Sequence, residues 1–274
     1  LEHNGGYSTR WLIDAKTLKP LNNVVSGNPT NFFDYRVGSS ATLVKLPESP
    51  SQYDLYRIGN NAGWTIEGEA YIEGLAFVGG YRGLETLASD SDDIAFNGCK
   101  FMYSRNNGLT AIGGNYYAYD CEASYNYLDG FNYHRSDSST PCAVEIECCG
   151  YYNGYKNTDD NSYSNNGSTI HDNGAIIRLN DKFGYCKGGV IADSASVSYN
   201  FGCEAFGSTC FVTSVPTNNC SIEAIQGTTM HLYDCFTYGS VYDLTCVNGN
   251  NKVYSTIDYA SKSIGDDDEV KIIV

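Results

Sequence analysis

A repeat of 22 residues constrains the fold of this chain more than any other feature. The segment DIAFNGCKFMYSRNNGLTAIGG (93–114) aligns without gaps on NYYAYDCEASYNYLDGFNYHRS (115–136), so that Cys99 falls on Cys121 (121 − 99 = 22). Units of this length, built of short alternating segments, cannot bury a hydrophobic face alone, and stacked copies must cover one another. The repeat therefore predicts a solenoid.

The composition favours strands over helices in this solenoid. Tyr (24) and Gly (29) are abundant, whereas Pro (6) and Met (2) are scarce. No window of about 12 residues shows a 3.6-residue apolar period, and the LxxLxL pattern of leucine-rich repeats is missing. We expect short strands that pair with the coils above and below at roughly 4.8 Å. The internal ladders expected from this pairing are Leu84, Leu109 and Phe131, and Cys99 and Cys121.

A glycine precedes the apolar residue of each ladder and marks a corner of the coil. Gly108 and Gly130 occupy this position, and Gly174 lies two periods further on (174 − 130 = 44). Glycine reaches backbone angles that other residues avoid, so we expect it to supply the turn. The same corner is expected at all three glycines.

These features resemble the right-handed parallel β-helix of pectate-lyase-like proteins, particularly phage tailspikes and their capsule depolymerases. The resemblance rests on the glycine-apolar turns, the Asn-rich turns and the Cys and aromatic ladders, and covers about residues 65–250. It implies an all-β, right-handed single-stranded parallel β-helix with coils of about 22–28 residues. It also implies a homotrimer and a location on the virion tail, or outside the cell after release. No diagnostic catalytic motif of one lyase or hydrolase family is present, so the resemblance assigns no catalytic residue.

The domain organisation follows from where the repeat begins. Residues 1–62 are less regular and are expected to cap the solenoid, because an open end is an unpaired strand edge. Residues 63–274 are expected to form one continuous β-helix domain. The start at Leu1 is compatible with a fragment of a longer chain.

Charge and hydropathy exclude two classes of partner. The formal net charge is −15, whereas nucleic-acid binding draws on clustered Lys and Arg. No apolar run of about 18 residues is present, so we expect no membrane span. A surface rich in Tyr, Asn and Asp suits a hydroxyl-rich partner such as a polysaccharide.

The 11 cysteines show neither paired CxxC zinc spacing nor the framework of a small secreted domain. Most lie among alternating apolar residues, as buried thiols do. We expect free thiols facing the core, and therefore folding in a reducing cytoplasm. No cofactor and no metal site are predicted, because Asp159, Asp160 and Asp172 lack the spacing of a calcium loop. The thiols expected in the core are Cys99, Cys121, Cys148, Cys186, Cys203 and Cys235.

A column of cationic side chains is the first candidate site. Alternation along a strand points the fourth position after each corner glycine outward. This position is His134 in the second repeat, and counting 22 and 44 residues further gives Lys156 and Arg178. Such a column could neutralise a uronate carboxylate and assist removal of the α-proton, the chemistry of a lyase. The alternative is a row of ordinary solvated side chains.

Two glutamates in the segment AVEIEC form the second candidate site. We expect Val144 and Ile146 to face the core while Glu145 and Glu147 share the outer face, roughly 6–7 Å apart. This spacing lies between those of retaining and inverting glycosidases. Asp172 is expected on the same wall, and crowded carboxylates raise one pKa, which suits a general acid. The alternative is a strand with a charged outer face.

The adjacent residues His171 and Asp172 are a weaker candidate for a base and its orienting partner. Neighbouring residues on a strand face opposite ways, so catalysis by this pair is not expected.

Tyrosines cluster in three successive coils of the repeat. Tyr combines a flat apolar body with a hydroxyl, which suits stacking on a sugar and hydrogen bonding to its edge. About half should face inward by alternation, and the rest are expected to line a groove over residues 125–180. The residues expected to bind polysaccharide there are Tyr125, Tyr127, Asp129, Tyr133, Arg135, Tyr152 and Lys156.

The resemblance and these candidates together predict binding and depolymerisation of a bacterial surface polysaccharide. Cleavage would be hydrolysis through Glu145, Glu147 or Asp172, or elimination using His134 and Arg178. The alternative is a non-catalytic receptor-binding or structural module of the same fold. Exposed carboxylates more than about 10 Å apart, without a groove, would favour this alternative.

Overall fold

The described part of the chain is all-β. A computed structural model describes residues 10–14, 32–37, 40–45, 56–58, 64–154, 165–209 and 219–274. Every regular element in these ranges is a strand. Within the same ranges there is accordingly no helix with the length and apolarity needed to cross a membrane.

Successive strands alternate among three parallel sheets, here named sheets 1, 2 and 3. Each coil between residues 64 and 238 contributes one strand to each sheet, whereas the described residues 242–272 contribute strands to sheets 1 and 2. Sheet 1 contains β5 (Trp64–Glu67), β8 (Leu84–Leu87), β11 (Leu109–Ile112), β14 (Phe131–His134), β17 (Ser168–Ile170), β20 (Ile191–Ser194), β23 (Cys220–Ile225), β26 (Tyr242–Cys246) and β28 (Lys262–Ile264). Sheet 2 contains β6 (Ala70–Glu73), β9 (Asp93–Asn97), β12 (Asn115–Tyr119), β15 (Cys142–Ile146), β18 (Ala175–Leu179), β21 (Val197–Phe201), β24 (Thr229–Tyr233), β27 (Lys252–Ser255) and β29 (Glu269–Ile272). Sheet 3 contains β7 (Leu75–Gly79), β10 (Lys100–Met102), β13 (Glu122–Ser124), β16 (Cys149–Tyr151), β19 (Lys182–Gly184), β22 (Glu204–Phe206) and β25 (Phe236–Tyr238).

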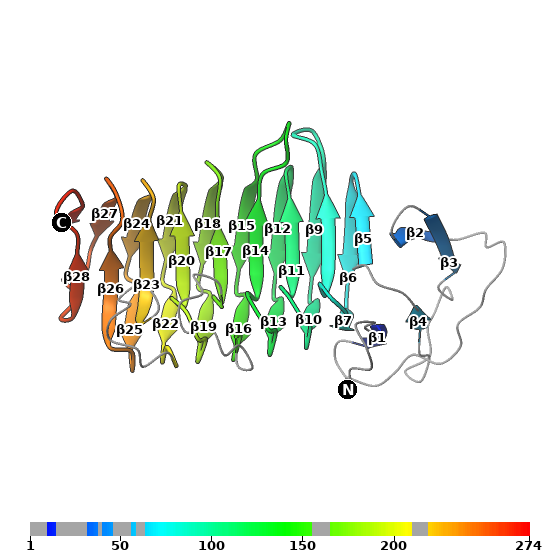
Figure 1. The fold of residues 1–274 in the computed structure, drawn as a ribbon, viewed down its shortest axis with the longest axis horizontal. Helices are drawn as coiled ribbons and strands as arrows, with labels where there is room; N and C mark the ends of the chain where they lie inside the picture. Colours follow the sequence, from blue (N-terminus) through cyan, green and yellow to red (C-terminus); the bar gives the residue numbers. More distant parts are fainter. Residues whose placement is uncertain are drawn as a thin grey trace.

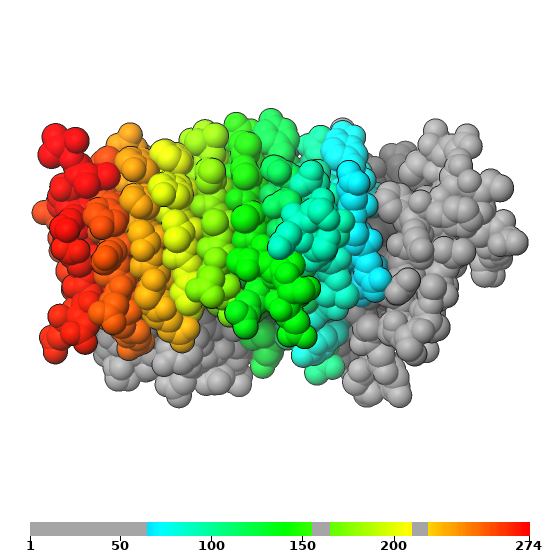
Figure 2. Space-filling model, turned by 90° about the horizontal axis from the view of Figure 1, so that it is seen from above, coloured from blue at the N-terminus to red at the C-terminus, as the bar shows by residue number. Residues whose placement is uncertain are grey.

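The coils are stacked along the long axis of the molecule. Figure 1 shows the strands side by side from β5 to β28, and Figure 2 shows the coils as successive colour bands. This is the arrangement of a parallel β-helix, in which each coil buries the next one. The sequence prediction of an all-β fold with parallel strands is confirmed in this respect.

Two short strands from the N-terminal segment extend one sheet edge. β1 (Arg10–Asp14) runs antiparallel to β7, and β4 (Tyr56–Ile58) runs antiparallel to β1. β2 (Phe32–Val37) and β3 (Ser40–Lys45) form a separate hairpin. β1 thus pairs with a strand edge of sheet 3 that would otherwise be open, which is the role expected of a cap. A domain division near residue 62 stays a prediction.

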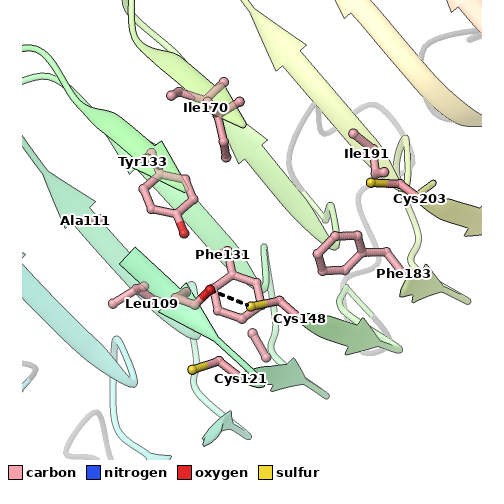
Figure 3. Packing of buried hydrophobic residues seen from close by; sticks show 14 of the residues in the cluster. Leu109, Ala111, Cys121, Phe131, Tyr133, Cys148, Ile170, Phe183, Ile191 and Cys203 are labelled. Carbon is pink, nitrogen blue, oxygen red and sulfur yellow. Dashed lines mark hydrogen bonds between the residues drawn. The ribbon is translucent and has the colours of Figure 1, made fainter. Parts of the chain in front are cut away.

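The predicted internal ladders are present. Leu84, Leu109 and Phe131 pair in register on β8, β11 and β14 and are fully buried. Figure 3 shows side chains of this kind pointing into the space between the sheets. The ten described cysteines are all free thiols. One turn position, just before each strand of sheet 3, carries a second ladder whose members are Cys99, Cys121, Cys148, Asp181, Cys203 and Cys235.

The corner glycines are needed because there is no room for a Cβ atom, not because their φ angle is positive. A Cβ on Gly108 would lie 2.9 Å from the carbonyl oxygen of Gly130, and a Cβ on Gly130 would lie 2.5 Å from that of Gly167. None of these glycines has a positive φ, so the turn explanation is wrong here. The expected equivalence of Gly174 is also wrong, because Phe131 pairs with Ser168, 37 residues on (168 − 131 = 37). Gly174 instead precedes β18 of sheet 2.

Candidate functional site

Glu145 and Arg178, expected on the outer wall, lie inside the β-helix. Both side chains are 0% exposed, and the two residues pair in register on β15 and β18. On β15, Ala143 and Glu145 are buried while Val144 and Ile146 are partly exposed. The expected phase of this strand is therefore wrong. Alternation shows which residues of a strand share a face but not which face is buried. Here the face with Glu145 is the buried one, because Arg178 on the next strand neutralises its charge.

A closed network of hydrogen bonds holds these buried charges. The Arg178 guanidinium donates to both carboxylate oxygens of Asp193, at 2.8 and 2.9 Å. Its Nε donates to Ser168 Oγ at 2.9 Å and lies 3.3 Å from Glu145 Oε2. Ser168 Oγ and the Tyr133 hydroxyl both donate to Glu145, at 2.9 and 2.8 Å. Each charge is paired, as buried ions must be.

This network is closed to a polymeric ligand. Tyr133 is also 0% exposed, so it cannot contact a polysaccharide either. Burial raises the pKa of Glu145, against the opposing charge of Arg178. Glu147 lies on the exposed turn after β15 with a φ of 55°. The predicted outer pair of Glu145 and Glu147 is therefore not formed.

His134 and Asp172 come together on the surface, where β14 ends. Tyr133 pairs with Ile170, which brings His134 beside His171. The two imidazole rings stack with centroids 4.7 Å apart and planes 4° apart. His134 Nδ1 lies 3.3 Å from Asp172 Oδ2, and these two side chains are 37% and 45% exposed. The structure thus joins three residues that the sequence placed in two separate candidate sites.

The predicted outward column is correct only as far as His134. Leu87, Ile112 and His134 follow one another in register, as expected. The next member is His171 rather than Lys156, because this coil is longer than 22 residues (171 − 134 = 37). Lys156 lies outside the described residues, and Arg178 faces the core. The three-membered cationic column is therefore wrong.

The environment of the two histidines favours their neutral forms. Burial lowers the pKa of His134, the neighbouring His171 lowers it further, and Asp172 opposes both effects. Burial also lowers the pKa of His171. A neutral imidazole beside a carboxylate can accept a proton, as a general base does. Among the predicted residues, His134 and Asp172 form an exposed pair in which an acid and a base contact each other.

Asp129 has a structural role in the turn before β14. It is 1% exposed and accepts hydrogen bonds from the backbone N–H groups of Asn165 and Asn166, at 2.6 and 2.9 Å. Asn132 Nδ2 donates to it at 2.5 Å. Burial raises the pKa of Asp129, and the backbone hydrogen bonds oppose this effect. Its predicted contact with a ligand would require this turn to open.

Tyr125 and Tyr152 belong to a stack of four surface tyrosines on successive coils. The ring centroids of Tyr103, Tyr125, Tyr152 and Tyr185 are 5.2, 5.2 and 5.1 Å apart. All four residues have φ between 55° and 60°, a left-handed conformation that is rare for bulky side chains. The faces of Tyr125 and Tyr152 are covered by their neighbours, so only their edges and hydroxyls remain for a sugar. Tyr127 and Arg135 are exposed, as predicted.

The outer face of sheet 2 is a second candidate site, which the sequence prediction missed. Two rows of mainly apolar and aromatic side chains run along it, because outward positions of successive strands pair in register. The first row is Tyr71, Ala95, Tyr117, Val144, Ile177, Tyr199, His231 and Tyr254. The second row is Glu73, Asn97, Tyr119, Ile146, Leu179, Phe201 and Tyr233.

Two shallow hollows interrupt the first row. One of about 240 Å³ lies over Ala95, with Tyr71 and Tyr117 on either side, and reaches Val144 and Ile146 of the next coil. The other, of about 230 Å³, lies over Val144, between Tyr117 and Ile177. Neither lining contains an ionised side chain. Aligning the coils strand by strand could have found the hollows, but the constant count of 22 loses the register after His134.

A resident metal ion has no site among the described residues, since no three His, Cys, Asp or Glu side chains converge there. Comparison with known proteins adds no family, because no protein-family model, curated protein or solved structure matches the chain.

Proposed function

We propose that the chain is the polysaccharide-binding part of a phage tailspike-like protein, with the outer face of sheet 2 as its binding surface. The observation that carries this proposal is the pair of apolar and aromatic rows running along the coils. Contiguous exposed apolar patches of more than a few hundred Å² mark binding sites in folded proteins. The rows cross at least seven strands, which at about 4.8 Å per strand is a length of roughly 30 Å.

The chemistry of this face favours a hydroxyl-rich polymer with few charges, in which an occasional uronate is compatible. Tyr side chains offer both an apolar surface and a hydroxyl, and Tyr71, Tyr117, Tyr119 and Tyr199 are exposed on it. The chain as a whole carries a net charge of −15. An acidic protein repels polyanions such as nucleic acids over a distance of about one Debye length. A bacterial surface polysaccharide meets these requirements.

The finer features of the proposal follow from the resemblance. The β-helix would be right-handed, as connections between parallel strands of one sheet almost always are. The protein would form homotrimers, fold in a reducing cytoplasm and act on the virion tail. The free thiols support the reducing compartment.

Binding to purified bacterial capsular and O-antigen polysaccharides, measured by calorimetry, tests this function. We expect Tyr117→Ala to weaken binding about tenfold, since loss of a stacked aromatic ring is worth about 1.4 kcal/mol. Phe236→Ala is the matched control, because Phe236 is 57% exposed but lies on sheet 3. Equal loss in both variants, or no binding of any such polysaccharide by the native chain, would overturn the proposal.

Cleavage of the bound polysaccharide at His134 is a second candidate function. It is favoured by the exposed contact of His134 with Asp172 and by the lowered pKa of the imidazole. A neutral His134 could remove the C5 proton of a uronate, after which the C4–O bond breaks and the departing oxygen takes up a proton. The product would be an unsaturated uronate, which absorbs in the ultraviolet.

An absorbance assay with a parallel reducing-end assay tests cleavage. We expect His134→Asn to abolish product formation while binding persists, with Phe236→Ala on sheet 3 as the control that keeps both binding and product. Reducing ends without unsaturated uronate would indicate hydrolysis. Binding by the native chain without either product would leave the non-catalytic function alone.

A further inference from the structure

We propose that the hollows over Ala95 and Val144 are two sugar-binding slots, each of which takes one ring from a chain end or a single-sugar branch of the polysaccharide. This inference rests on the proposed function of the outer face of sheet 2. It adds where on that face the sugar rings lie and which kind of polysaccharide they come from.

The slots lie where non-aromatic side chains interrupt a row of rings. In the later coils, one ring follows another on each strand: Tyr199 and His231 are 4.5 Å apart, and His231 and Tyr254 are 4.9 Å apart. One coil therefore advances the row by the thickness of one ring. Where a small side chain replaces a ring, as at Ala95, the row lacks one ring.

The gap has the width that one inserted ring requires. Tyr71 and Tyr117 lie two coils apart, which at about 4.8 Å per coil gives roughly 9.6 Å. A ring in van der Waals contact on both faces needs roughly 7–8 Å between its neighbours. A puckered sugar ring is slightly thicker than a flat one, so it fits the width of roughly 9.6 Å between Tyr71 and Tyr117. The hollows, at about 240 and 230 Å³, are smaller than the roughly 300–1,000 Å³ of sites for drug-sized ligands.

The walls of the Ala95 slot are positioned to leave it open. The Tyr71 hydroxyl lies 3.3 Å from Glu73 Oε2 and 3.4 Å from Asn97 Nδ2. Glu73 and Asn97 lie two positions further along their strands than Tyr71 and Ala95, so the hydroxyl of Tyr71 is held beyond Ala95 rather than over it. The Asn97 Nδ2 group donates to the Tyr71 hydroxyl and to Glu73 Oε1, so the Tyr71 and Asn97 Oδ1 oxygens at the rim can accept hydrogen bonds from sugar hydroxyls.

The orientation of the slots selects the kind of polysaccharide. A ring held between Tyr71 and Tyr117 lies across the long axis of the β-helix, so its bonds to other sugars leave through its edges. A chain extending along the coils cannot thread such a slot, whereas a terminal or branch sugar can enter from outside. The slots over Ala95 and Val144 are also two coils apart, or roughly 9.6 Å, and can bind neighbouring branches together.

Filling the slots with the aromatic residue of the row tests the proposal. In Ala95→Tyr/Val144→Tyr the new rings would continue the stack, so we expect the thermal midpoint to stay the same or rise. Affinity for a branched polysaccharide should fall at least tenfold. The matched control is Thr229→Tyr, which adds a tyrosine to the same face but away from both hollows.

Methyl glycosides of glucose, galactose, mannose and rhamnose are the probes for single slots. We expect at least one to bind the native chain in saturation-transfer NMR, and none to bind the filled variant. Cys142, an exposed thiol in the lining of the Val144 slot, gives a second readout. Bound polysaccharide should slow its alkylation in the native chain.

The outcomes separate the slots from the proposed function. If the native chain and the filled variant bind polysaccharide equally well, sugar rings do not occupy the slots, but the proposed polysaccharide binding is still supported. If the native chain binds no polysaccharide, the function fails and the slots fail with it. A change of oligomeric state on filling, without a change in glycan affinity, would show a second copy of the chain as the occupant and overturn the proposal.

Discussion

The middle coils bury charged side chains in their interior, whereas the outer face of sheet 2 exposes apolar ones. Both are the reverse of what is usual in folded proteins. Inside, Arg178, Glu145 and Asp193 are 0% exposed. Outside, apolar side chains such as Ile177 and Tyr119 are 44% and 49% exposed. Charged side chains are rarely fully buried, and extended apolar faces are rarely left open.

The two regions differ in whether contacts within the described residues explain their unusual burial or exposure. These three charges have ion-pair or hydrogen-bond partners on neighbouring strands, so the structure itself explains their burial. Within the described residues, many side chains of the outer rows stay exposed, such as Tyr71 at 60% and Tyr117 at 46%. Burying this apolar surface would stabilise the protein by roughly 25 cal/mol for each Å² removed from water. The ligand proposed above would account for this exposure.

The largest expected effect is the loss of the buried cation. Arg178→Ala would leave Glu145 and Asp193 buried without their partner. We expect the free energy of unfolding to fall by about 3–5 kcal/mol, measured by denaturant titration. A fall of less than about 1 kcal/mol would show that water reaches this region and would remove the contrast with the outer face.

The control for this prediction removes the charges together. Replacing Arg178, Glu145 and Asp193 by Met, Leu and Leu leaves no unpaired ion. We expect it to cost much less than Arg178→Ala, because buried ion networks can be exchanged for apolar groups at little cost. If both variants lose equal stability, side-chain shape rather than charge pairing explains the effect.

A buried carboxyl without a partner for one oxygen provides the second prediction. Glu223 is 1% exposed, and among the described residues its Oε1 has no hydrogen-bond partner. Burial and the charge of Asp193 raise its pKa well above the ordinary value. The unfolded chain releases this proton near pH 4.3 while the folded chain keeps it, so stability must fall as pH rises above that value.

Glu223→Gln should remove this share of the pH dependence. We expect the variant to be more stable than the native chain at pH 7 and similar to it at pH 4. The loss in the native chain is about 1.4 kcal/mol for each pH unit over which only the unfolded form is ionised. Denaturant titrations at pH 4, 5.5 and 7 measure it. Parallel pH curves for the two proteins would contradict the raised pKa.

The sequence predicted the stacking of the coils but not which face several strands present. Leu84, Leu109 and Phe131 were identified because a glycine precedes each one and their spacings differ by only three residues (109 − 84 = 25, 131 − 109 = 22). Arg178 was misplaced because the coil after His134 is longer, and a period of 22 cannot be carried across it. His171 and Asp172 were found near the candidate site, although their contact with His134 depends on that same coil length.

The outer face of sheet 2 was missed for a physical reason. Alternation in segments such as CAVEI and AIIRL is compatible with either phase, and hydrophobicity favours placing Val144, Ile146 and Ile177 inside. The structure does the reverse, since the opposite phase brings Glu145 and Arg178 together in the core. An ion pair between coils therefore decides the phase, and it cannot be seen within one repeat.

The surface tyrosine stack gives the third prediction, of intermediate size. Tyr152 is exposed like the sheet 2 aromatics, but its faces are covered by Tyr125 and Tyr185. We expect Tyr152→Ala to lower the free energy of unfolding by about 1–2 kcal/mol through loss of two aromatic contacts. Glycan affinity should stay unchanged, which would separate stacked from unstacked surface tyrosines.

Tyr152→Gly is the informative companion to this variant. In later coils the same turn position holds Gly207 and Gly239, with φ of 61° and 74°. Glycine accepts a positive φ, whereas alanine does so at a cost of roughly 1 kcal/mol. We therefore expect the Gly variant to be more stable than the Ala variant by about that amount. The reverse order would show that this backbone conformation is not strained.

The smallest expected effect on stability is that of a substitution on the outer face of sheet 2. Two adjacent residues on β18, one buried and one exposed, allow a direct comparison. Ile176 is buried and Ile177 is 44% exposed. Ile177→Thr keeps a β-branched side chain, so the free energy of unfolding should change by no more than about 0.5 kcal/mol. Ile176→Thr places a hydroxyl in the core and should cost about 1–3 kcal/mol.

Glycan affinity should respond in the opposite order. Ile177 forms one wall of the hollow over Val144, so Ile177→Thr should weaken polysaccharide binding severalfold at nearly native stability. Ile176→Thr, measured at a temperature where it remains folded, should bind like the native chain. Calorimetry on both variants decides the matter. If Ile177→Thr were as destabilising as Ile176→Thr, the outer row would be part of the folding core, and its exposure would no longer point to a ligand.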